Sequence, residues 1–105
     1  MNKAEFAAEA QRIIAARLSP LRLLSYEQAS AIAPVSDEQD VVVAGCKCQV
    51  ATFAQVLVGG DVLIVVLVAR PSFLGISRHT DGGLVFSPQK SVRDATDEEI
   101  RNNGG

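Results

Sequence analysis

The fold of this chain is decided by one stretch, Val62-Leu63-Ile64-Val65-Val66-Leu67-Val68-Ala69. Its eight consecutive apolar residues lie between a Gly59-Gly60 pair and Arg70-Pro71. A short apolar run that is rich in β-branched residues and bounded by turn residues is typical of a buried strand. We therefore interpret 62–69 as the central strand of an antiparallel sheet.

The size and composition of the chain are those of one small domain. With 105 residues it can bury a single core without disulfides or metals. The hydrophobic fraction is 48% but the aromatic fraction only 5%, so small and branched aliphatic side chains must fill the interior. The 10 basic and 12 acidic residues are mixed along the chain and leave a net charge of −2. Without a basic cluster, nucleic acid is not an expected partner.

The first third of the chain, 1–34, has a helical pattern. Charged residues separate its apolar positions, which recur at helical spacing and predict an amphipathic helix of about five turns that Ser19-Pro20 ends. The apolar positions are Phe6, Ala10, Ile13, Ile14, Leu18 and Leu21. A second helix begins at Ser25, because Ser25 and Gln28 have the spacing of a capping box, and it stops at Pro34.

The middle of the chain, 41–93, has the pattern of a sheet. We interpret 35–40 as a polar connection before the first strand begins at Val41. The glycines within 44–47 and 58–61 predict two hairpin turns, so three strands follow one another as a meander. Residues 70–81 read as irregular; a fourth strand is expected at Leu84-Val85-Phe86 and a short fifth strand at Ser91-Val92-Arg93.

The last residues predict a short helix over 96–101, because Thr96 and Glu99 form a second capping box. The acids Asp97 to Glu99 are explained by the positive end of the helix dipole and not by a metal site. The tail 102–105 is expected to be disordered. The prediction for 1–105 is thus one α+β domain, with two N-terminal helices on one face of a four- to five-stranded antiparallel meander and a short C-terminal helix.

The central strand is apolar on both faces, which predicts association. Alternate residues of a strand face opposite sides of the sheet. One set is Leu63, Val65, Leu67 and Ala69; the other is Val62, Ile64, Val66 and Val68. Two helices cover one face, so the other is expected to be the interface of a two-fold homodimer, formed by Leu63, Val65 and Leu67 or by Val62, Ile64, Val66 and Val68. Two alternatives are a sheet curled around a cavity and a C-terminal segment folded over the second face.

Two cysteines, Cys46 and Cys48, are candidate metal ligands or nucleophiles. Their spacing places both sulfurs on one side of an extended segment, and His79 could add a third ligand. A structural zinc site uses four ligands, and the chain has no second cysteine pair. We therefore favour the interpretation that both cysteines are small strand residues at a hairpin.

The segment after the central strand holds the candidate catalytic or ligand-binding residues. Arg70, Arg78, His79 and Asp81 crowd this segment, and His79 with Asp81 could form an acid–base pair. Such residues in a Gly-rich loop are more often turn formers and solvated charges. If the chain has a polar site, we expect it here.

The function expected from these patterns is that of a non-enzymatic binding protein that forms homodimers through an apolar sheet face. The alternative is a small enzyme or ligand-binding protein with a helix–sheet pocket, whose mouth is the 70–81 loop. No cofactor is implied by any motif. The N-terminal charges leave no signal-peptide core and no apolar run reaches the roughly 20 residues of a membrane helix, so we expect a cytoplasmic protein without membrane contact.

Overall fold

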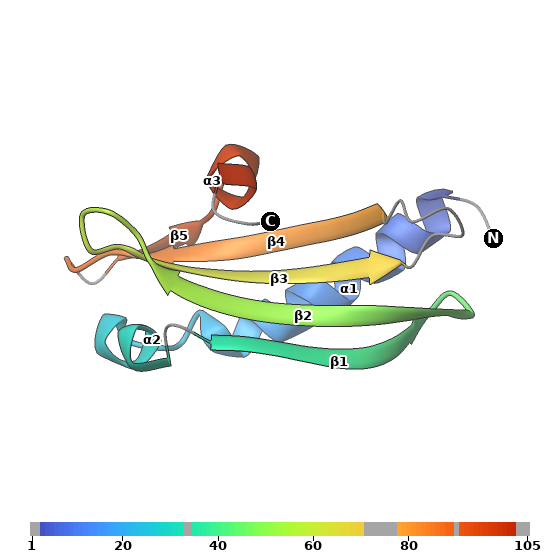
Figure 1. The fold of residues 1–105 in the computed structure, drawn as a ribbon, viewed down its shortest axis with the longest axis horizontal. Coiled ribbons are helices and arrows are strands. Elements are labelled where there is room, and N and C mark those ends of the chain that lie inside the picture. Colours follow the sequence, from blue (N-terminus) through green and yellow to red (C-terminus); the bar gives the residue numbers. More distant parts are fainter. Residues whose placement is uncertain (1–2, 33–34, 71–77, 90, 103–105) are drawn as a thin grey trace.

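The chain folds as helices on a single antiparallel sheet (Figure 1). A computed structural model describes residues 3–32, 35–70, 78–89 and 91–102. The elements in chain order are α1 (Lys3–Leu21), α2 (Tyr26–Ile32), β1 (Val35–Val43), β2 (Cys46–Val56), β3 (Val62–Arg70), β4 (Arg78–Phe86), β5 (Val92–Asp94) and α3 (Asp97–Asn102). The strand order β1-β2-β3-β4-β5 confirms the predicted α+β meander.

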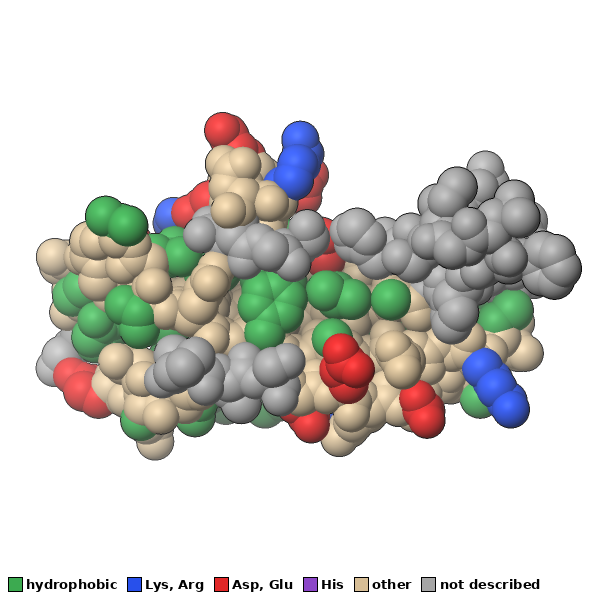
Figure 2. Space-filling model, in the orientation of Figure 1, with side chains coloured by type: hydrophobic (Ala, Val, Ile, Leu, Met, Phe, Trp, Pro, Cys, Tyr) green, Lys and Arg blue, Asp and Glu red, His purple; other side chains and the backbone are tan. Residues whose placement is uncertain are grey.

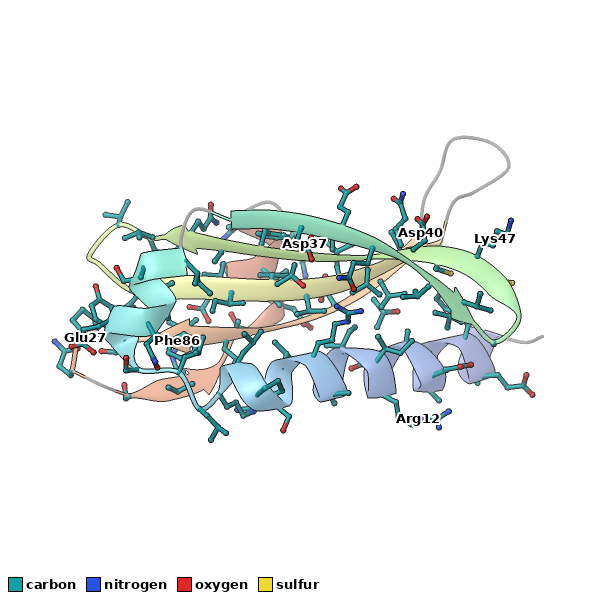
Figure 3. All side chains as sticks on the ribbon, turned by 90° about the horizontal axis from the view of Figure 1, so that it is seen from below. Arg12, Glu27, Asp37, Asp40, Lys47 and Phe86 are labelled. Carbon is teal, nitrogen blue, oxygen red and sulfur yellow. The ribbon has the colours of Figure 1, made fainter. Side chains whose placement is uncertain are left out.

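Helices α1 and α2 lie on one face of the sheet, and α3 lies on the other (Figures 1 and 3). The α1 side chains that reach the sheet recur every four residues along one stripe of the helix. These are Phe6, Ala10, Ile14 and Leu18, all buried. They pack on Val62, Ile64, Val66 and Val68 of β3, with Leu84 and Phe86 of β4 in the same core. In Figure 3 Phe86 points between the layers, whereas Arg12 points away from the sheet.

Hydrogen bonds at both ends fix this helix layer on the sheet. The backbone N–H of Ala44 donates to Oε2 of Glu9 at 2.7 Å, near the start of α1. At the other end the Tyr26 hydroxyl donates to the carbonyl oxygen of Gly60 at 2.6 Å. The predicted capping box of α2 is confirmed, because Gln28 N–H donates to Ser25 Oγ and Ser25 N–H donates to Gln28 Oε1. The helix α1 runs one residue beyond Pro20, which lies in its last turn.

The first strand begins earlier than its sequence pattern predicts. Residues 35–40, interpreted as a polar connection, belong to β1 and pair with β2 from Val35 to Val43. The polar residues of 35–40 predicted a connection and not a strand. They are compatible with a strand because β1 is the edge of the sheet, where Asp37, Glu38 and Asp40 remain exposed to water. Charged side chains on an edge strand also oppose pairing with a strand of another molecule.

The turn after β1 is shorter than expected. It consists of Ala44 and Gly45 alone, with φ angles of 48° and 81°, and β2 starts at Cys46. Two residues with positive φ form the hairpin turn whose twist matches that of the flanking strands.

The fourth strand is longer than expected. Part of the segment 70–81, interpreted as irregular, forms the start of β4, which pairs with β3 from Arg70–Arg78 to Val62–Phe86. Gly82 makes this possible beneath α1, because a Cβ there would lie 2.9 Å from Cγ2 of Ile14. Two adjacent glycines are typical of a loop in sequence, but here Gly82 lets α1 approach β4 closely.

A charge on the α1 side of β3 should unfold the domain. Val66 is fully buried beneath the helices, so Val66→Asp would bury an unpaired carboxylate. We expect a loss of at least about 3 kcal/mol in the free energy of unfolding, measured by urea denaturation. The matched control is Val42→Asp at an exposed position of β1, which should change it by less than about 0.5 kcal/mol. Equal effects of the two variants would contradict the assigned register.

Candidate functional site

The second face of β3, opposite α1, is covered at one end by the C-terminal segment. Ile100 of α3 is buried there against Leu63, Val65 and Val85. These three side chains are at most 2% exposed. The C-terminal segment thus folds over part of the face that was predicted to be a dimer interface. Burial of one isoleucine side chain contributes about 2 kcal/mol to holding it there.

A glycine allows the C-terminal segment to reach the sheet. The backbone N–H of Ala95 donates to the carbonyl oxygen of Gly83 at 2.8 Å. A Cβ on Gly83 would lie 2.8 Å from the carbonyl oxygen of Ile64 and 3.2 Å from Cβ of Ala95. A side chain at this position would therefore push the segment away from the sheet.

The start of α3 is held by the predicted capping box and by an ion pair. Glu99 N–H donates to Oγ1 of Thr96 at 3.1 Å, and Thr96 N–H donates to Oε1 of Glu99 at 2.9 Å, which confirms the capping box. The Arg93 guanidinium binds both carboxylate oxygens of Glu99 at 2.7 Å. The hydrogen bonds from Arg93 and from Thr96 lower the pKa of Glu99 to about 2. The same carboxylate raises the pKa of Arg93.

The other end of the second face holds a strip of partly buried apolar residues. The strip consists of Ala51, Phe53, Leu67 and Ala69, and it joins the covered end because Phe53 lies opposite Val65 in the register. Figure 2 looks onto this face, where hydrophobic side chains run along the middle.

Charged side chains border this apolar strip. Glu38 and Asp40 lie on the β1 side, Lys47 near the hairpin and Asp81 on β4, opposite Leu67. In Figure 3 Asp40 and Lys47 project on the side away from α1. An apolar centre with a charged rim is the usual arrangement of a protein interface.

The two interface sets predicted for β3 have different positions. Val62, Ile64, Val66 and Val68 are fully buried beneath the helices, so this set belongs to the core and not to a surface. In the other set Leu63 and Val65 lie beneath α3, while Leu67 is partly exposed in the strip. One feature of the sequence could have indicated that α3 packs on this face. Ile100 is the one apolar residue in the helix Asp97–Asn102.

Three of the four polar candidates lie at the far end of the β3–β4 pair. Arg70 pairs with Arg78 and Ala69 with His79 along the backbone, while the side chains of Arg70, Arg78 and His79 and the segment 71–77 lie outside the described residues. The fourth candidate, Asp81, is half-buried and lines a cleft. The predicted acid–base pair therefore stays a prediction.

The cleft at Asp81 lies between α1, β4 and the C-terminal segment and has a volume of about 330 Å³. Ile14, Leu18 and Ile100 contribute apolar surface to it. Charged residues also line it, namely Arg22, Asp81, Asp94 and Asp97. Arg22 and Asp94 form an exposed ion pair that links the end of α1 to β5.

The cysteines lie on the helix-facing side of β2. Both are free thiols; Cys48 is buried in the core and Cys46 packs against it. Among the residues that the structure describes, no group of three His, Cys, Asp or Glu side chains is placed to hold a metal ion. Both cysteines lie at the start of β2, next to the hairpin turn, and their role as metal ligands or nucleophiles is untested.

Comparison with known proteins returned no match: no family model, no curated protein and no solved structure is significantly similar to this chain. Within its described part, the chain has no helix that is both long and apolar enough to cross a membrane.

The Arg93–Glu99 pair should make stability depend on pH in the acid range. Because folding lowers the pKa of Glu99 from 4.5 to about 2, its contribution is present above pH 4.5 and lost as the pH falls towards 2. Both side chains are partly exposed, so we expect about 1 kcal/mol. Urea denaturation of the wild type and Glu99→Gln should differ by this amount at pH 7 and converge near pH 2. A constant difference would contradict the assignment.

Proposed function

We propose that this protein is a non-enzymatic binding protein that self-associates through the second face of its sheet, the face opposite α1. The observation that carries the proposal is the strip of Ala51, Phe53, Leu67 and Ala69, which remains partly exposed and has a charged rim. Apolar strips of this kind in soluble proteins mark interaction sites more often than chance. The partner is a second copy, because two-fold homodimers are the commonest assemblies of soluble proteins.

A two-fold contact on this face would place the apolar strip of one copy against the strip of the other. It would also allow opposite charges to pair at the rim. Among the side chains that the structure describes, the rim contains the cation Lys47 and the acids Glu38, Asp40 and Asp81. When two copies face each other, Lys47 of one can lie near an acid of the other. The two free cysteines support a reducing compartment, so the proposal includes a cytoplasmic location.

A second candidate function is the binding of a small molecule in the cleft at Asp81. The cleft volume of about 330 Å³ falls within the range of ligand sites. Its mixed apolar and charged surface would suit a small amphiphilic molecule. Thermal-shift screening of such molecules tests this alternative, and a true ligand should lose its stabilising effect in Asp81→Asn. A hit that stabilises Asp81→Asn equally would not bind at this cleft.

A cation in the middle of the strip should dissociate the dimer and leave the fold intact. Leu67→Lys places an ammonium group opposite Asp81 on β4, which is a favourable pair across strands. We expect the solution mass, measured by light scattering behind a sizing column, to fall from twice the 11.1 kDa chain mass to one chain mass. The melting temperature of the monomer should change by only a few degrees.

The control for this substitution is Val56→Lys. Val56 is exposed at the end of β2 and lies opposite Val62, on the side of the sheet that faces the helices, so the dimer should persist in this variant. A monomeric wild type at tens of micromolar, or a dimer that survives Leu67→Lys, would refute the proposed interface.

A further inference from the structure

The strand β1 lies at the border of the sheet, and its outer edge is open. Within the described part of the chain, β1 pairs with β2 alone, over the nine residues Val35–Val43 (Figure 1). The outer edge of such a strand presents a row of backbone N–H and C=O groups that can pair with a further strand. Addition of a strand to an open edge is a recurrent way in which proteins bind extended peptides.

The hydrogen bonds of the sheet show which residues of β1 direct their backbone groups outward. The N–H of Leu57, one residue beyond β2, donates to the carbonyl oxygen of Asp61 at 2.7 Å, so odd-numbered residues of β2 bond towards β3. Even-numbered residues of β2 therefore bond towards β1, and the register pairs them with odd-numbered residues of β1. The N–H and C=O groups of Glu38, Asp40 and Val42 thus point away from β2, along the open edge.

The side chains of these three residues lie on the second face of the sheet, at its border. All three are exposed, Val42 to 64%. Glu38 lies opposite Ala51 of the strip, which places the alternate residues Glu38, Asp40 and Val42 on the face away from α1. Acidic side chains lie over this border in Figure 2, and Asp40 projects away from α1 in Figure 3. In an added strand, the residues directly opposite these three would project from the same face.

Two cations lie near β1 and define what the edge can accept. Arg17 of α1 donates to Oε1 of Gln39 at 2.7 Å, and Gln39 alternates with the acids, so this cation lies on the helix side of the strand. Lys47 lies opposite Val42 on the second face. A further cation opposite Val42 would therefore lie close to Lys47, whereas cations opposite Glu38 and Asp40 would meet carboxylates.

We propose that the open edge of β1 binds an extended basic peptide segment as an additional antiparallel strand. Two basic residues separated by one residue lie opposite Asp40 and Glu38, and an apolar residue two positions before them lies opposite Val42. Opposite charges directly across a strand pair are stabilising, and the backbone hydrogen bonds supply affinity that does not depend on sequence. The inference does not rest on the proposed dimer, because it uses the border of the sheet and not the apolar strip.

The same charges exclude a second copy of the chain from this edge. In an antiparallel pair of two β1 strands centred on residues 38–40, Glu38 of one copy would lie opposite Asp40 of the other. Like charges in this position are destabilising, so the acids protect the edge from pairing with itself. A basic segment meets the same carboxylates with the opposite charge. The edge therefore selects its partner by charge.

The test measures the binding of a fluorescently labelled, end-blocked peptide in which threonine alternates with valine, lysine and lysine, in that order. In the antiparallel register the valine lies opposite Val42 and the lysines lie opposite Asp40 and Glu38. One control peptide has glutamate in place of both lysines. The other has the two lysines at adjacent positions, so that they project to opposite faces. Fluorescence anisotropy at low ionic strength gives the dissociation constants, and hydrogen exchange followed by NMR locates the bound peptide.

Two variants separate the charges of the edge from its backbone. Glu38→Gln combined with Asp40→Asn removes both acids, and its control, Glu27→Gln combined with Glu98→Gln, removes two exposed acids from helices. Val42→Pro removes an outward N–H and adds a ring, which an edge strand tolerates but an added strand does not. Its control is Val42→Thr, which keeps the N–H.

We expect the alternating basic peptide to bind and to slow exchange at the amides of Glu38, Asp40 and Val42. The amides of Gln39 and Val41, which already bond to β2, should change little. Loss of both acids should weaken binding about fivefold, and Val42→Pro should weaken it by about tenfold or more. The two control variants should bind as the wild type does, and both control peptides should bind more weakly than the alternating basic peptide.

Several results would overturn the inference: no binding of the alternating basic peptide, equal binding of either control peptide, or slowed exchange at residues outside β1. Equal binding by Val42→Pro and Val42→Thr would also overturn it, because the peptide would then not pair with the backbone of the edge. If Val42→Pro fails to fold by circular dichroism, the exchange pattern of the wild type and the loss of affinity on removal of both acids decide.

Discussion

The strand β3 carries apolar side chains on both faces, and this constraint shapes the rest of the molecule. One face is covered by α1 and α2, and α1 presents a buried residue every four positions along the sheet. The other face needs a second layer, and the described segment after β5 contributes the six-residue helix α3 to it. The short helix α3 covers one end of that face through Ile100, and the other end remains a partly exposed strip. The candidate interaction surface is the part of this face that α3 leaves uncovered.

The parts of the fold that depend on local chemistry were predictable from sequence. The capping boxes at Ser25 and Thr96, the two glycine turns and the central strand each need only neighbouring residues, and the structure confirms them. The extent of β1 and β4 was not predictable in this way. The strand β1 lies at the edge of the sheet and is exposed to water, so its sequence shows no alternation of apolar and polar residues. The glycines of β4 allow α1 and Ala95, from distant parts of the chain, to approach this strand closely.

The candidate surface was predictable only in outline. The two-sided apolar pattern of β3 indicates that both faces need cover, but alternation does not tell which set faces the helices. In the structure Val66 is buried and Leu67 is partly exposed, so the set that contains Val66 faces the helices. Ile100 is recognisable as the apolar residue of its helix, but its contacts with Leu63, Val65 and Val85 join distant parts of the chain and are not contained in a local pattern. The cleft at Asp81 likewise needs three distant segments to meet.

The order of the strands has a consequence for how the protein folds. Every strand pairs with the next one in the chain, so the sheet can form hairpin by hairpin with only short loops to close. The helix α1 is the exception, because its main contact is with β4, the strand fourth in line. Its docking must wait until β4 has paired with β3, since Ile14 packs over Gly82. The helix α1, which is synthesised before the strands, is therefore expected to reach its final place among the last of these elements.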